Sequence, residues 1–351
     1  MRGMNPRRPL RRSARPASHP PVEFQSTLQP AYPPTDHPTR AYAPPPDVYY
    51  GPVRRPVRRR SFVLGYCLGL VGGALCLLAS LLAVVFVFAP ARTNILVLGL
   101  DRRPQETHYI VRTDTMILAT VNPDAPYVGM LSIPRDLYVT LPWGYLGRVN
   151  TAHVFAENDA PGTGPAAAME TVRSNFGVDV HHYVRIDLAG FVRIVDALGG
   201  VDIDVPKALI DYEYPTYDYG TRTVEFQAGP QHMDGEAALA YARIRHGSSD
   251  FQRAERQQLV IKALFVQMLK PATWPRLPAV LAAVNESIDT DVDLLLALRL
   301  VPTLLRVGPE DLDSRVIQGD MVQPFTTEGG GAVQLPVWEA INPVLQEMFG
   351  Q

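Results

Sequence analysis

The sequence contains only two cysteines in 351 residues, and both, Cys67 and Cys76, lie within one long apolar run. Everything after that run therefore has no cysteine with which to form a disulfide or to carry thiol chemistry. This part of the chain must be stable through its own hydrophobic core, which a segment of about 260 residues can supply.

Two further absences exclude classes of function. The sequence has no G-x-x-x-x-G-K-[ST] loop to hold nucleotide phosphates, and no helix-turn-helix pattern in its first 60 residues. Residues 1–60 hold 12 of the 33 basic and 3 of the 35 acidic residues, so 21 basic and 32 acidic residues remain downstream, an excess of 11 negative charges. Because nucleic-acid binding needs the opposite sign, we expect no nucleic-acid partner.

Aliphatic periodicity is almost missing from residues 1–60, which carry 14 of the 33 prolines. Such a segment cannot bury enough apolar surface to offset the entropy of ordering, so we interpret it as a disordered, Pro/Arg-rich cytoplasmic tail. Its proline cluster at residues 44–46 is typical of extended polyproline structure, which serves either as a plain spacer or as a partner-binding segment.

A long uncharged run follows the tail. Residues 62–88 contain no charged residue, and as a helix they would be about 40 Å long against a hydrocarbon core of about 30 Å. We therefore predict a transmembrane helix at residues 61–89 rather than a signal peptide, whose apolar core would be shorter and would follow a short basic start.

The charges beside this run predict its orientation. Five arginines lie just before it and only Arg92 shortly after it, so the positive-inside rule places the N-terminus in the cytoplasm. We expect a single-pass cell-membrane protein whose following domain is extracellular. Gly65, Gly69 and Gly73 form small-xxx-small steps that allow a homodimer through the helix.

Downstream, apolar runs and helical periodicity alternate. Strands are predicted at residues 94–100, 115–121, 127–133 and 201–205, and helices at residues 166–176, 188–198, 234–242 and 250–269. Residues 274–284 and 294–305 are expected to cover the sheet, and the tyrosine-rich residues 212–220 to form an exposed loop. This order predicts an α/β fold, a three-layer α/β/α sandwich with a central mixed sheet, over residues 92–320, with a C-terminal extension at 321–351 that packs on the domain or trails from it.

Two aspartates and several arginines indicate a site for a metal-bound polyphosphate. Asp101 and Asp114 are hard oxygen ligands of the kind that Mg²⁺ takes, and arginine binds phosphate oxygens in pairs. Arg112 and Asp114 share one side of an extended segment, as do Arg243 and Arg245, whereas Arg253, Arg256 and Gln257 share one helix face. The alternative is that these arginines only form solvated ion pairs and that Asp136 holds Arg135 in a structural bridge.

The sequence resembles the LytR-CpsA-Psr family of cell-envelope proteins. Seven phrases carry the resemblance in order: NILVLGLDRR (94–103), RTDTMILATVNP (112–123), LSIPRDLYV (131–139), RVNTAH (148–153), LAGFVRIVDALGGVDIDVP (188–206), HMDGEAALAYARIRH (232–246) and DFQRAERQQ (250–258). The likeness extends more weakly to about residue 320. Three positions depart from the frequent residue of the family: Arg148 replaces a lysine, Leu137 a threonine and His153 an aromatic residue.

The resemblance implies a role for each matching residue. Asp101 and Asp114 would hold Mg²⁺. Pyrophosphate would be bound by Arg112, Arg135, Arg243, Arg245, Arg253 and Gln257. Asp114, Arg135 and Asp250 would be catalytic, with Asp250 assisting proton transfer, and the lipid tail would occupy an apolar tunnel.

The implied activity is transfer of a glycopolymer from a polyprenyl (undecaprenyl) pyrophosphate carrier to peptidoglycan or another cell-wall acceptor. Two alternatives stay open. A polyprenyl-pyrophosphate hydrolase would use the same site with water as the nucleophile, and a membrane regulator or adaptor would bind the lipid without turning it over. The sequence does not distinguish a teichoic acid from a capsular polysaccharide or arabinogalactan.

Overall fold

The computed structural model describes residues 51, 60–87, 90–102, 109–216, 220–244, 249–308 and 311–350. The predicted tail lies almost wholly outside these residues. The chain divides into Met1–Phe62 and Val63–Gln351, and every element from the first strand onward belongs to the second unit.

The first helix, α1, comprises Arg60–Val87 and contains both cysteines, which are free thiols. Within the described residues, no helix combines the length and the apolar composition that a membrane span requires. The transmembrane segment stays a prediction from the sequence.

A six-stranded mixed sheet forms the centre of the second unit. Its strand order is β11 (Ile288–Thr290), β6 (His182–Asp187), β1 (Thr93–Leu100), β2 (Thr113–Asn122), β3 (Tyr127–Ser132) and β12 (Asp313–Val316). The pairs β6–β1 and β3–β12 are parallel, whereas the other three are antiparallel. The predicted α/β class with a central mixed sheet is confirmed.

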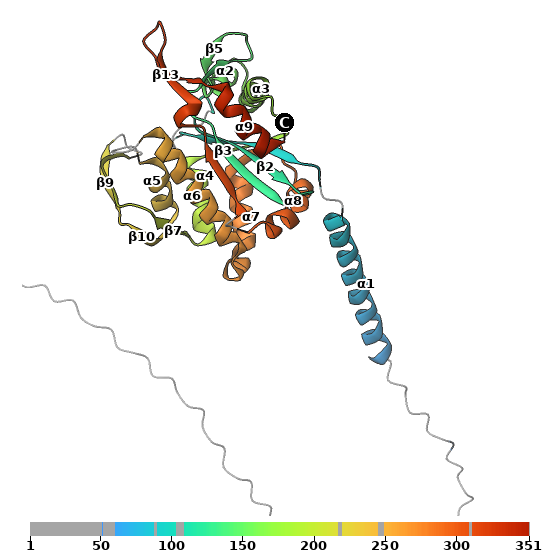
Figure 1. Ribbon diagram of the computed structural model, residues 1–351. Helices are drawn as coiled ribbons and strands as arrows, with labels where there is room; N and C mark the ends of the chain where they lie inside the picture. Colours follow the sequence, from blue (N-terminus) through green and yellow to red (C-terminus); the bar gives the residue numbers. More distant parts are fainter. Residues whose placement is uncertain are drawn as a thin grey trace, which may run out of the picture. The chain divides into compact units, whose positions relative to one another are not determined.

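Helices cover both faces of this sheet, as Figure 1 shows. On one face Leu96 and Leu98 pack with Val172 of α3 (Gly164–Phe176) and Met348 of α9 (Trp338–Phe349). On the other face Val121 packs with α8 (Leu294–Arg306). The two sets alternate along each strand, because successive side chains point to opposite faces.

A second cluster of buried residues forms around the fully buried Tyr241 of α5 (Gly235–Arg243). It takes in α4 (Leu188–Leu198), α6 (Asp250–Leu269) and the paired strands β7 (Val201–Val205) and β10 (Gly229–Met233). The predicted ends of α3 and α4 are confirmed, because Gly177 and Gly199 adopt the left-handed conformation that ends a helix.

The expectation of an exposed loop at residues 212–220 is wrong for its first part. Residues 212–215 belong to β8 (Leu209–Pro215), which pairs with β9 (Thr221–Phe226). Asp211 and Tyr214 are both buried although they lie three residues apart, because the register of the β8–β9 pair shifts between them, and Tyr212 is exposed. Residues 217–219 lie outside the described residues.

The remaining elements complete the unit. They are α2 (Thr151–Asp159), α7 (Leu277–Ser287), the short pair β4 (Tyr138–Thr140) and β5 (Leu146–Arg148), and the hairpin β13 (Val322–Thr326) and β14 (Ala332–Pro336). Helix α9 follows this hairpin and buries Ile341 in the same cluster as Leu96. The final part of the chain therefore supplies one face of the main core.

Candidate functional site

The topology brings the predicted acidic residues to one end of the sheet. Strands β1 and β2 are antiparallel, and Leu100 is paired with Thr113, so Asp101 leaves β1 beside the start of β2, where Asp114 lies. Strand β3 is antiparallel to β2 and ends at the same edge, three residues before Arg135. Three segments that are distant in sequence thus deliver charged side chains to one place.

A cavity of about 280 Å³ lies at this end. Five of the predicted site residues line it: Asp114, Arg135, Asp250, Arg253 and Gln257. The last two share one face of α6, four residues apart, as the sequence predicts. Residue Phe251 adds an apolar wall.

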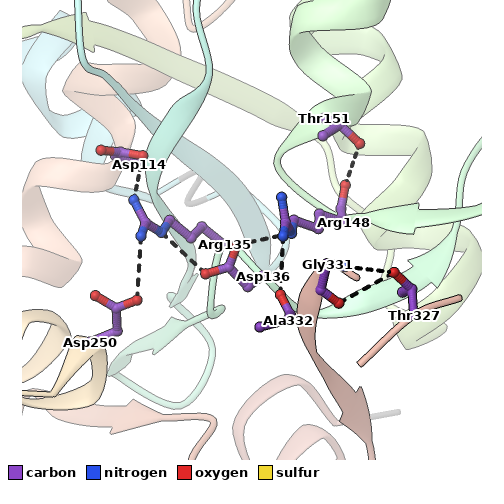
Figure 2. Close-up of polar contacts among 9 residues, drawn as sticks. All are labelled: Asp114, Arg135, Asp136, Arg148, Thr151, Asp250, Thr327, Gly331 and Ala332. Carbon is purple, nitrogen blue, oxygen red and sulfur yellow. Dashed lines mark hydrogen bonds and ion pairs between the residues drawn. The ribbon is translucent and has the colours of Figure 1, made fainter. Parts of the chain in front are cut away.

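Arg135 joins the carboxylates around the cavity, as Figure 2 shows. Its guanidinium donates from Nη1 to Asp114 Oδ1 at 3.1 Å, from Nε to Asp136 Oδ2 at 3.3 Å and from Nη2 to Asp250 Oδ2 at 3.5 Å. Burial lowers the pKa of Arg135, but the charges of Asp114, Asp250 and Asp136 more than offset it, so the pKa is raised overall. The guanidinium therefore stays cationic and is held in one orientation.

The first turn of α6 also lines the cavity. Ser249 caps this helix: its hydroxyl accepts a hydrogen bond from the backbone N–H of Gln252, and the Gln252 side-chain Oε1 accepts one from the backbone N–H of Ser249. Asp250 then forms an ion pair with Arg253, with 3.2 Å between Oδ1 and Nη1. Because a helix N-terminus carries partial positive charge, this turn and Arg253 together favour an anion in the cavity.

Other predicted residues lie beside the cavity rather than in its wall. Arg243 donates from Nη2 to Asp101 Oδ1 at 2.8 Å, so these two form an ion pair next to the sheet end. Arg112 is exposed just before β2. Arg245 lies outside the described residues.

A magnesium ion fits the donor set at this end of the sheet. Asp101 and Asp114 are both part-exposed and come from neighbouring strands, and their carboxylate oxygens are the ligands that Mg²⁺ prefers. Within the described residues no group of three or more acidic, histidine or cysteine side chains is gathered as a metal site. Phosphate oxygens and water would therefore have to complete the coordination.

Arg256, which the sequence places on the same face of α6 as Arg253, has a structural role. It is buried and donates to the backbone carbonyl oxygens of Tyr241, at 3.1 Å from Nε, and of Ile244. Burial lowers its pKa. It ties α6 to the end of α5 and so positions Arg253 one turn away.

The structure adds residues that sequence reasoning did not place in the site. The bridge between Arg135 and Asp136 continues to Arg148, whose Nε lies 3.3 Å from Asp136 Oδ1 and whose Nη2 donates to Ala332 O at 3.1 Å. Gln334 of β14 lines the cavity as well. No local pattern marks Gln334, because it reaches the site only through the packing of the C-terminal hairpin.

These features define an α/β protein with a cavity suited to a phosphorylated ligand at one end of its sheet. Residues 89–339 match the LytR_cpsA_psr family, and the chain belongs to this family.

A relative agrees with this assignment, and two solved structures share the fold. The chain is 33% identical over 203 residues to the polyisoprenyl-teichoic acid--peptidoglycan teichoic acid transferase TagU of Oceanobacillus iheyensis, a match that covers 57% of this chain and 59% of that one. The crystal structure of B. subtilis TagV superposes with a TM-score of 0.59 at 24% identity, covering 74% of this chain and 98% of that one. TagT bound to LIIa-WTA superposes with a TM-score of 0.58 at 23% identity, covering 74% and 92%. At these identities the structures show a shared fold.

Proposed function

We propose that this protein is a magnesium-dependent phosphotransferase that moves a glycopolymer from a polyprenyl pyrophosphate carrier to peptidoglycan or another cell-wall acceptor. The observation that carries the proposal is the cavity in which Asp114, Arg135, Asp250 and Arg253 converge. Membership of the family and the printed name of the relative TagU, a teichoic acid transferase, support it.

In the proposed reaction an acceptor hydroxyl oxygen attacks the phosphorus that carries the glycopolymer. A new P–O bond forms, the bond to the bridging oxygen breaks, and the lipid monophosphate leaves with the electron pair of that bond. Arg135 and Arg253 stabilise the negative charge that accumulates on the phosphate oxygens. Asp250, which is half exposed at the cavity mouth, accepts the proton of the attacking hydroxyl.

The metal would be held by Asp101 and Asp114. When bound, Mg²⁺ supplies positive charge to the pyrophosphate oxygens. The ion pairs that these aspartates form with Arg243 and Arg135 keep the carboxylates oriented at the sheet end. Arg112, Arg243, Arg245 and Gln257 are proposed to contact the pyrophosphate around this centre.

We further propose that the protein is anchored in the cell membrane by residues 61–89, with its N-terminus cytoplasmic and the domain that begins at residue 92 extracellular. The uncharged run and the arginines before it support the anchor. An outward stripe on α8 agrees with a position beside lipid, because three leucines spaced by helical turns stay largely exposed, namely Leu294, Leu298 and Leu305. Gly65, Gly69 and Gly73 support a homodimer within the membrane.

The test uses the full-length protein in detergent with a polyprenyl-pyrophosphate-linked sugar and magnesium, with and without peptidoglycan. Asp114→Ala and Arg135→Ala are compared with Arg173→Ala, which removes an exposed arginine paired with Glu170 on α3, outside the cavity. We expect sugar phosphate to appear on peptidoglycan with the unsubstituted protein and Arg173→Ala, and to be strongly reduced with the other two.

Two outcomes would replace the proposal. Lipid phosphate released equally fast without peptidoglycan would favour a hydrolase. Tight lipid binding without turnover in any condition would favour a regulator or adaptor.

A further inference from the structure

We call the cavity lined by Asp114, Arg135 and Asp250 the phosphate cavity. A second hollow adjoins it and has no role in the reaction described above. It has a volume of about 260 Å³ and lies between the loop after β3 and the β13–β14 hairpin, so we call it the hairpin hollow. Its lining is Asp136, Pro324, Phe325, Thr326, Ala332, Val333 and Gln334. Asp136 and Gln334 line the phosphate cavity too, so the two spaces meet at these side chains.

Phe325 gives the hairpin hollow an aromatic wall. Its side chain is 46% exposed although it lies in a strand of a folded hairpin. The face of an aromatic ring carries partial negative charge and packs well on the partly positive C–H groups of a sugar ring. An exposed phenylalanine in a hollow of this size therefore suits a pyranose better than a charged group.

Gln334 provides an unused acceptor at the junction. Its Oε1 is buried and accepts no hydrogen bond from the described residues. A buried acceptor without a donor is unfavourable, and rotation of the Gln334 side chain toward the hollow would let a hydroxyl or acetamido group of a ligand satisfy it. Asp136, which faces the same space, adds a carboxylate acceptor whose charge is balanced by Arg135 and Arg148.

The wall is held in place before any ligand arrives. Gln334 N donates to Asp136 O at 3.0 Å, and Arg148 Nη2 donates to Ala332 O. Thr327 and Gly331 close the hairpin with three mutual hydrogen bonds, two of them through the threonine hydroxyl. Figure 2 shows this chain of contacts running from Asp114 through Arg135, Asp136 and Arg148 to the hairpin. Rigid walls reduce the entropy lost on binding.

We propose that the hairpin hollow is a saccharide subsite, which holds one neutral pyranose ring bearing hydroxyl or acetamido groups beside the pyrophosphate. The inference rests on the proposed function, because it assigns the ring to one of the two substrates. The sugar could come from the donor polymer or from the acceptor glycan, and the ring is recognised by Phe325 and Gln334 in either case.

The direct test measures binding of a chitotetraose probe to the full-length protein in detergent, by saturation-transfer NMR and calorimetry. Phe325→Ala should weaken binding about tenfold, as expected for loss of an aromatic contact, and Phe325→Tyr should restore it. Gln334→Met, which keeps the size but removes the acceptor, should weaken binding as well. Binding of inorganic pyrophosphate should be unchanged in the two Phe325 variants, because Phe325 does not line the phosphate cavity.

Phe155→Ala is the matched control, because Phe155 is 43% exposed on α2 and is outside both hollows. The inference is overturned if the unsubstituted protein does not bind chitotetraose, or if Phe325→Ala weakens binding no more than Phe155→Ala does.

Kinetics then identify the source of the sugar. If Phe325→Ala raises the KM for peptidoglycan and leaves the donor KM unchanged, the ring belongs to the acceptor. If Phe325→Ala instead raises the KM for the donor, the ring belongs to the glycopolymer. If no turnover is found but chitotetraose binding depends on Phe325, the proposed function fails while the saccharide subsite stands.

Discussion

Replacement of Arg135 tests the proposed site most directly. This side chain is 22% exposed and contacts three carboxylates, so its loss affects both the stability of the fold and the proposed reaction. The expected changes in kcat and in unfolding free energy separate the two effects. Loss of one preorganised donor to a developing oxyanion lowers kcat by about 10²–10³.

The cost to stability should be smaller. The partners of Arg135 are 26%, 30% and 47% exposed, and ion pairs that are open to solvent contribute only about 0.2–1 kcal/mol each. Removal of the guanidinium also leaves three neighbouring carboxylates that can be hydrated. We therefore expect Arg135→Ala to lose at most about 3 kcal/mol of unfolding free energy on this scale.

The assay follows transfer of labelled glycopolymer to peptidoglycan beside urea unfolding of the same preparations. Arg135→Lys retains the charge but cannot bridge two carboxylates with a planar fork, so its activity should lie between those of the parent and Arg135→Ala. A variant that is stable and transfers at the parent rate would refute the assignment. A variant that loses both activity and most of its stability would show that Arg135 is chiefly structural.

Three further changes have distinct readouts. Asp114→Asn should raise the magnesium concentration needed for half-maximal transfer, and an unchanged magnesium titration would contradict its role as a ligand. Arg256→Ala removes two buried hydrogen bonds to backbone carbonyls, so the free energy of unfolding should fall by about 2–5 kcal/mol, against less than about 1 kcal/mol for a solvent-exposed arginine such as Arg173. Burial and the charge of Arg185 lower the pKa of His153 to about 4. An unfolded histidine binds its proton near pH 6.5, so the free energy of unfolding should be about 2 kcal/mol lower at pH 5 than above pH 6.5. His153→Gln removes this titration, so in urea unfolding its free energy of unfolding should fall by about 2 kcal/mol less than that of the parent between pH 7 and pH 5.

The elements with strong local signals were predicted well. Helix α6 begins and ends at the predicted residues because Ser249 caps it and Pro271 follows it, and both signals are local. Three strands of the central sheet, β1, β2 and β3, were also found because they are apolar runs, whereas β6, β11 and β12 were not predicted. The β8–β9 hairpin was missed, because a register shift buries Asp211 and Tyr214 three residues apart and so leaves no simple alternation along β8.

The candidate site divides in the same way. The spacing along α6 was enough to place Arg253 and Gln257 on one face, but it treated Arg256 as their equal. Only the packing of α6 against α5 shows that Arg256 donates its hydrogen bonds to backbone carbonyl oxygens. Likewise, Arg243 carries the expected charge, yet its position beside Asp101 and outside the cavity wall follows from where α5 ends.

By itself the sequence determined the class of fold, the residue types that make up the candidate site and the boundaries of the elements with strong local signals, because these depend on periodicity, caps and residue type. The tertiary structure decided which of those residues meet. Antiparallel pairing brings Asp101 and Asp114 to one sheet end, and the loop after β3 sets Arg135 among three carboxylates. The C-terminal hairpin adds Phe325 and Gln334 beside them, a contact between residues about 200 positions apart that no local pattern encodes.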